Sequence, residues 1–89
     1  MTEMKIAARQ CRDEAGTLHR FQYFLTVEEA QSPGLCLEHY GVRIAEENGA
    51  SSAVNGVTTS ASRIDELMTL LVDELVGPAG LHDVVADWL

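Results

Sequence analysis

The residues best suited to chemistry stand in the middle of the chain, where Cys36, His39, Tyr40 and Arg43 follow one another closely. A thiol and an imidazole this near in sequence can act as a nucleophile and its base, or as two ligands of a metal ion. Two ligands do not make a zinc site, which needs three or four. We therefore treat Cys36, His39 and Arg43 as candidates for lining a pocket, and predict no catalytic residue, no metal site and no cofactor.

Carboxylates also cluster in the last third of the chain. Asp83 and Asp87 lie one helical turn apart, but the neighbouring His82 points about 100° away from Asp83 on a helix, so we interpret the two carboxylates as a solvated face. Asp73 and Glu74 stand in the last turns of a predicted helix, where the helix dipole disfavours negative charge. Either an arginine of this chain or a basic patch on a partner protein is expected to compensate them.

The composition describes one small, acidic domain of 89 residues with a formal net charge of -8 and 46% apolar residues. A chain this short builds one modest core and no second domain, so residues 1–89 are predicted to be a single domain. Its acidity argues against binding to nucleic acids or anionic membranes, because Lys and Arg supply the affinity for phosphates. We find neither a membrane-spanning apolar stretch nor a secretory signal. Two cysteines without a CxxC motif are typical of a reduced, cytoplasmic protein.

The charge is unevenly distributed along the chain. Residues 1–20 hold four cations and three carboxylates, whereas residues 21–89 hold two cations and eleven carboxylates. We expect the basic N-terminal segment to pair with the acidic body, either within the chain or between subunits.

Alternating apolar and polar residues predict four strands, over residues 3–12, 18–29, 35–46 and 50–59. In the second strand, Phe21, Tyr23 and Val27 point to one face, while Leu18 and Phe24 point to the other. A Pro-Gly turn and an Asn-Gly turn separate the later strands.

The third predicted strand changes its register, because Leu35 and Leu37 occupy odd positions while Tyr40, Val42 and Ile44 occupy even ones. One inserted residue near His39–Gly41 would place both sets on one face, and Gly41 would allow the bent backbone of such a β-bulge. The alternative is a strand that is apolar on both faces, covered by helices on one side and by another subunit on the other.

From residue 61 onward the apolar residues recur at steps of three and four, which predicts helices over residues 61–76 and 78–88. Gly77 is expected to provide the left-handed stop of the first helix, and Pro78 suits the first position of the second. The predicted fold class is α+β, an antiparallel β-meander of three to four strands packed on one face by two C-terminal helices.

Two stretches resemble a known family, the strand Tyr40-Gly41-Val42-Arg43-Ile44 and the C-terminal segment 76–89, with its Gly-Pro break, its Leu81-His82-Asp83-Val84 run and its Asp87-Trp88-Leu89 end. Together they resemble an uncharacterised family of short bacterial proteins, found among Gram-positive anaerobes, that carries only a domain-of-unknown-function label. The resemblance implies a bacterial cytoplasmic protein. It brings no activity, cofactor or catalytic residue.

The leading hypothesis is a non-enzymatic protein–protein interaction or regulatory module that forms a homodimer or binds another protein. It rests on apolar and aromatic residues that the predicted core does not need, which are candidate contacts. These candidates are Leu18, Phe24, Leu35, Leu37, Tyr40 and Trp88. The alternative is a small-molecule-binding or catalytic domain with a pocket between sheet and helices, to which Cys36, His39, Tyr40 and Arg43 would contribute.

Overall fold

The computed structural model describes the backbone of residues 1–32 and 35–89 and the side chains of residues 1–29 and 37–89. Four strands are followed by two helices, which a single turn of 3-10 helix separates. In chain order these elements are β1 (Thr2–Arg12), β2 (Leu18–Ser32), β3 (Leu35–Glu46), β4 (Ser51–Thr58), α1 (Ala61–Asp73), η1 (Pro78–Gly80) and α2 (Leu81–Trp88).

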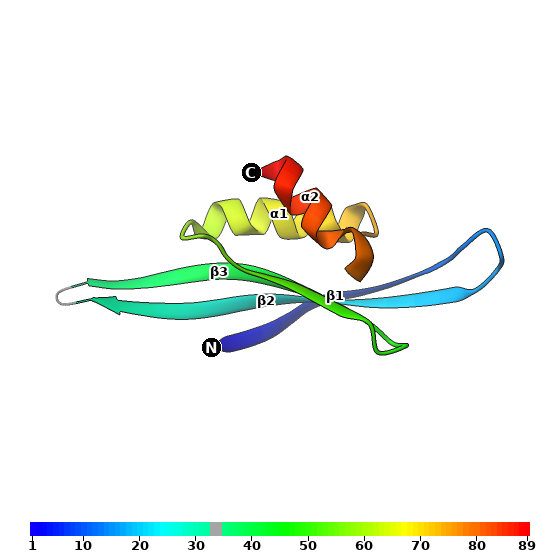
Figure 1. Ribbon diagram of the computed structural model, residues 1–89, viewed down its shortest axis with the longest axis horizontal. Coiled ribbons are helices and arrows are strands. Elements are labelled where there is room, and N and C mark those ends of the chain that lie inside the picture. The colour runs from blue at the N-terminus through cyan, green and yellow to red at the C-terminus, as the bar shows by residue number, and fades with distance from the viewer. Residues whose placement is uncertain (33–34) are drawn as a thin grey trace.

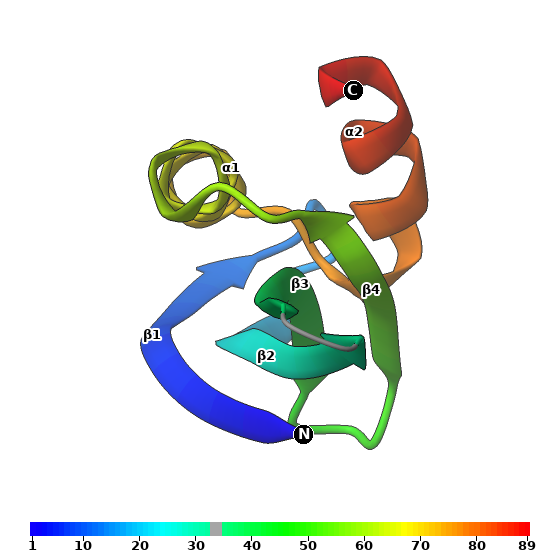
Figure 2. The same ribbon diagram turned by 90° about the vertical axis from the view of Figure 1, so that its left-hand side faces the viewer.

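The strands form one antiparallel sheet in the order β1-β2-β3-β4, and both helices lie on the same face of it (Figure 1). The predicted α+β meander is therefore confirmed. Seen end-on, β1 and β4 curl away on either side of the central strands (Figure 2). The molecule is elongated, with extents of 54 × 23 × 17 Å, because the strands extend beyond the helices at both ends. We call the covered side of the sheet the helix face and the other side the open face.

The core lies between the helix face of the two central strands and the apolar stripes of α1 and α2. Its largest fully buried side chains include Tyr23 of β2, Ile44 of β3, Leu67 and Leu71 of α1, and Leu81 of α2. Burying side chains of this size contributes about 1.5–3 kcal/mol each. The core therefore fixes the helices to one face, and no helix that the structure describes covers the other face.

Strand β3 contains no bulge toward its neighbour β2, and the prediction of one inserted residue near His39–Gly41 is wrong. Residues 35–46 pair with residues 21–32 without a register shift. Tyr40 and Val42 therefore face the helices, whereas Leu37 lies on the open face. The side chain of Leu35 is outside the described residues. Strand β3 thus carries apolar side chains on both faces, with Leu37 on the open face, as the alternative interpretation of its register predicted.

The irregularity lies in β4 instead. Tyr40 is paired with Thr58 and Val42 with Val54, so that residues 55–57 of β4 lie opposite Gly41 alone. Gly56 has a φ of 63°, a left-handed conformation that glycine adopts without strain. The extra residues bring the β4 backbone over Gly41, where a Cβ atom would lie 2.5 Å from the carbonyl oxygen of Val54.

Replacing Gly41 should therefore destabilise the protein severely. A Gly41→Ala variant forces the methyl group against backbone atoms that cannot rotate away, which we expect to cost about 2 kcal/mol or more and to lower the Tm by roughly 10 °C. Gly80→Ala is the matched control, since its Cβ would meet only a Val76 methyl carbon at 3.7 Å. Thermal unfolding followed by circular dichroism measures both. Equal Tm values for the two variants would contradict this role of Gly41.

Helix α1 ends at Asp73, before the predicted end at residue 76. Its stop is Leu75, which takes the left-handed conformation with a φ of 54°. The Val76 amide then donates to the Leu71 carbonyl at 3.0 Å, which closes the helix in a Schellman pattern. The prediction that Gly77 provides the left-handed stop is wrong, since its φ is -92°.

The linker after α1 is held against β2 by two contacts. The hydroxyl of Tyr23 donates to the carbonyl of Val76 at 2.9 Å, and burial raises the pKa of that hydroxyl above its ordinary value. Gly77 passes so close to Phe21 that a Cβ atom would lie 3.0 Å from Cζ of the ring. Gly77 therefore provides space for close packing, and the two contacts set where the chain turns toward α2.

The C-terminal end of α1 receives a cation from the N-terminal strand. Arg9 of β1 donates from Nη1 to the Val72 carbonyl at 3.0 Å, across 63 positions of sequence. A guanidinium at this end of a helix opposes its negative pole. The compensation expected at this end therefore comes from within the chain and reaches the backbone. Neither Asp73 nor Glu74 forms an ion pair with any residue that the structure describes.

Candidate interaction surfaces

The centre of the open face is occupied by an aromatic ring under an ion pair. The guanidinium of Arg43 lies 4.1 Å from the ring centroid of Phe24. Its Nε and Nη2 donate to the two carboxylate oxygens of Glu3 at 2.8 and 2.7 Å. These bonds lower the pKa of Glu3 below its ordinary value. Arg43 and Phe24 are therefore brought together, but each is used within the chain.

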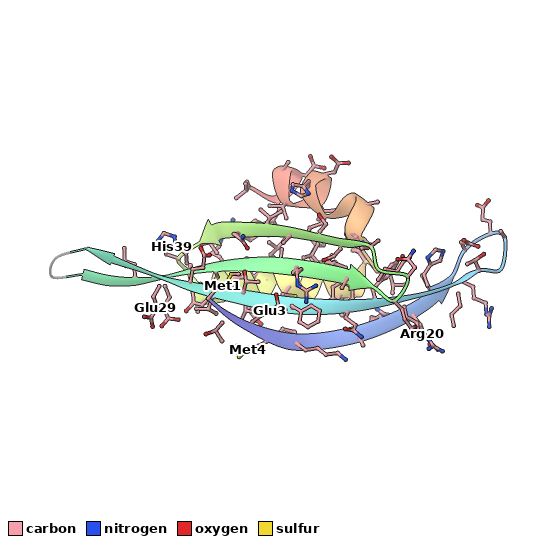
Figure 3. The ribbon with its side chains drawn as sticks, turned by 60° about the horizontal axis from the view of Figure 1, so that its bottom comes forward. Met1, Glu3, Met4, Arg20, Glu29 and His39 are labelled. Carbon is pink, nitrogen blue, oxygen red and sulfur yellow. The ribbon has the colours of Figure 1, made fainter. Side chains whose placement is uncertain are left out.

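The remaining open-face candidates lie apart from this cluster. Figure 3 looks onto the open face and places His39 toward the far end of the β2–β3 hairpin, away from Glu3. Leu37 lies beyond His39 on the same strand with 43% of its surface exposed, and Leu18 lies near the opposite end of the sheet with 37% exposed. The side chains of Leu35 and Cys36 are outside the described residues. The open face thus presents separate apolar side chains to solvent.

Tyr40 lies on the helix face, opposite to His39 and Arg43. It lines a small cavity of about 150 Å³ between the first half of β1 and α1, together with Ile6, Leu25 and Met68. The structure therefore does not gather His39, Tyr40 and Arg43 around one pocket between sheet and helices.

The first half of β1 is an exposed apolar edge that the sequence analysis did not select. The sheet order leaves the outer side of β1 without a neighbouring strand in the described part of the chain. Met4 and Ile6 are 47% and 49% exposed there, and Met4 is visible at the outer margin of the sheet (Figure 3). A register shift between Lys5 and Ala7 makes Ile6 the extra residue, which places it beside the small cavity.

A second apolar surface lies between the two helices. Among its residues, only Trp88 is a candidate that the sequence indicated. It is a groove of about 400 Å³ between the C-terminal half of α1 and α2. Its lining residues are Leu70, Glu74, Val76, Val84, Asp87 and Trp88. Leu70 falls outside the buried stripe of α1, and an apolar residue off the stripe was the signal that could have indicated this surface.

A histidine between two carboxylates ties three segments of the sheet together. Nε2 of His19 lies 2.9 Å from Oδ2 of Asp13, and Nδ1 lies 3.2 Å from Oε1 of Glu46. The hydrogen bond with Asp13, followed by the one with Glu46, raises the pKa of His19 above its ordinary value of 6.5. The same bond to His19 lowers the pKa of Asp13 below 3.8. When the imidazole is protonated, both ring nitrogens donate to these carboxylates and link the β1–β2 turn to the end of β3.

This triad should make the stability of the protein depend on pH. Because the folded-state pKa of His19 is raised, its contribution to the stability of the fold is complete below about pH 6.5. This contribution is lost as the pH rises through the raised pKa. The contribution of Asp13 is present above its ordinary pKa and is lost as the pH falls through its lowered one. Measured from about pH 5 to 8, the Tm of His19→Gln should fall less with rising pH than that of the wild type.

The control is His39→Gln, which removes an imidazole that forms no ion pair with a carboxylate in the described part of the chain. It should retain the wild-type dependence of Tm on pH. An unchanged slope in His19→Gln would refute the role of the triad.

Among the residues whose side chains are described, no group of three or more His, Cys, Asp and Glu side chains is arranged to hold a metal ion. None of the helices found in the described segments has the length and apolar character needed to cross a membrane.

The fold and its surfaces define a small α+β protein, in which helices cover one face of an open four-stranded sheet and leave an apolar edge and an interhelical groove exposed. The chain belongs to DUF6514, a family of unknown function whose model matches residues 2–89. Membership of an uncharacterised family, as the resemblance implied, is thereby confirmed. No curated protein and no solved structure matches the chain.

Proposed function

We propose that this protein is a non-enzymatic protein–protein interaction module that self-associates through the first half of β1. The observation that carries the proposal is the exposure of Met4 and Ile6, at 47% and 49%, on an edge strand. Exposed main-chain groups and apolar side chains on one edge favour association with a second chain.

The arrangement of side chains along β1 supports this half of the strand over the other. Met4 is paired with Leu25 and shares the helix face with it, so the exposed methionine continues an apolar surface that reaches the cavity beside α1. Glu3 on the opposite face is neutralised by Arg43. The first half of the strand carries one cation, Lys5, whereas the second half carries Arg9 and Arg12, and cations on an edge oppose strand pairing.

The size of the hollow between sheet and helices favours an interaction module over the small-molecule alternative. The cavity measures about 150 Å³, whereas ligand pockets are usually about 300–1,000 Å³. Its walls are mostly apolar, with Tyr40 and Asp65 as the polar side chains. The free thiol of Cys11 supports the further proposal that the module works in a reducing compartment such as the bacterial cytoplasm.

Light scattering coupled to size exclusion tests the self-association. The wild type should run as a dimer at about 100 μM, a concentration typical for weak interfaces. Met4→Lys combined with Ile6→Lys should run as a monomer, because two cations would have to be desolvated in the contact. Both positions are half exposed, so the variant should keep the wild-type circular dichroism spectrum.

The matched control is Leu18→Lys combined with Leu37→Lys, which adds the same charge to exposed apolar positions of the open face. It should remain a dimer. A monomeric wild type at this concentration would overturn the self-association, and loss of the dimer only in the open-face variant would place the contact on the open face instead.

A further inference from the structure

The groove between α1 and α2 has an apolar lining that the fold leaves open. Four of its six lining residues are apolar, namely Leu70, Val76, Val84 and Trp88. Leu70 keeps 36% of its surface exposed. The helices cover the sheet with Leu67, Leu71, Leu81 and Val85. Val76, Val84 and Trp88 pack against the margin of this core and stay only half-buried, so one side of each remains open to the groove. Trp88 is half-buried, with one face of its indole covered by Arg63 at 4.2 Å.

The charges around this groove are almost all negative. Residues 61–89 contain six carboxylates and one arginine. That arginine, Arg63, is stacked on Trp88 and lies 3.5 Å from Glu66. Glu74 and Asp87 line the groove, and neither forms an ion pair within the part of the chain that the structure describes.

The helix ends add to this negative potential. Glu74 is the C-cap of α1, and Asp87 stands in the last turn of α2. Both lie near the negative pole of a helix, where carboxylates are unfavourable unless a cation is near. The cation that reaches this end of α1, Arg9, donates to the Val72 carbonyl. A further cation supplied from outside would therefore be favoured at the groove.

We infer that the groove between α1 and α2 binds a basic amphipathic helix of a partner protein. Apolar side chains of that helix would pack between Leu70, Val84 and Trp88, as a third helix on the pair, while its Lys or Arg side chains would reach Glu74 and Asp87. Trp88 would be the central anchor, since tryptophan is enriched among the residues that dominate binding energy. The inference rests on the proposed function as an interaction module, but it uses a surface distinct from β1.

Trp88 is the only tryptophan of the chain and so reports directly on the groove. The probe is a synthetic helical peptide of Leu and Lys with its leucines along one face, titrated into the full-length protein. Its binding should shift the Trp88 emission to shorter wavelength. A peptide of identical composition but scrambled order, which has no apolar face, should bind at least about tenfold more weakly.

Charge reversal in the groove separates specific binding from general attraction. Glu74→Lys combined with Asp87→Lys should weaken binding about tenfold or more, and raising NaCl from about 50 to about 300 mM should weaken wild-type binding several-fold. The variant should fold, because both lysines suit the C-terminal ends of their helices. The matched control is Glu14→Lys combined with Glu28→Lys, which changes the net charge equally on exposed residues outside the helices and should keep wild-type affinity.

Each outcome decides the proposal. Equal weakening in both double variants, or equal binding of the scrambled peptide, would reduce the effect to non-specific attraction and overturn the inference. So would a Trp88 emission that does not respond to the peptide. A concentration-dependent shift of Trp88 without peptide, abolished by the groove variant, would assign the groove to a second copy of this chain instead.

Failure of the inference is distinguishable from failure of the proposed function. The variant with lysines at Met4 and Ile6 should still bind the peptide, and the groove variant should still form the dimer. Loss of peptide binding with the dimer intact would refute only the groove.

Discussion

The anchoring of the α1–α2 linker on β2 is the constraint on which the surfaces of this protein depend. A buried tyrosine hydroxyl holds the Val76 carbonyl at 2.9 Å, and Gly77 lies so close to the ring of Phe21 that a Cβ atom would be only 3.0 Å from Cζ. Leu75 accepts a left-handed conformation in the same turn. Because this segment is held on both sides, α2 must return over the sheet beside α1, and the pair is positioned with its groove open.

The same packing explains why the molecule is one-sided. Two short helices bury the helix face of the central strands, and no helix in the described part of the chain covers the open face, where the β4 backbone passes over Gly41 and Thr26. On the open face, the ring of Phe24 is covered by the guanidinium of Arg43, which is paired with the carboxylate of Glu3. Apolar side chains that neither arrangement covers remain at the margin of β1 and between the helices. The exposed surfaces thus consist of apolar side chains that a core of this size does not bury.

Much of the fold could be predicted because its periodicity is local. The alternation around Phe21 and Tyr23 and the three-to-four spacing from Ile64 to Leu71 reflect which side of each element is buried, and a single sheet with helices on one face satisfies all of them. The candidate site was predictable only in part. Trp88 and Leu37 were selected as apolar residues beyond the needs of the core. Met4 and Ile6 were overlooked because their alternation with polar residues is also that of a half-buried strand, and alternation alone does not tell which apolar face stays exposed.

By itself, the sequence determined the element types, their order, the acidic character of the helical segment and the face on which most strand residues lie. These properties follow from neighbours within a few positions along the chain. Only the tertiary structure decided that the bulge lies in β4, that Leu75 ends α1 and that Arg9 compensates the end of that helix. It also decided which apolar residues stay exposed. These features depend on contacts between segments that lie far apart in the sequence, such as the Val54 carbonyl at Gly41, the Tyr23 hydroxyl at Val76 and the Arg9 guanidinium at Val72. Such contacts are not encoded in local periodicity.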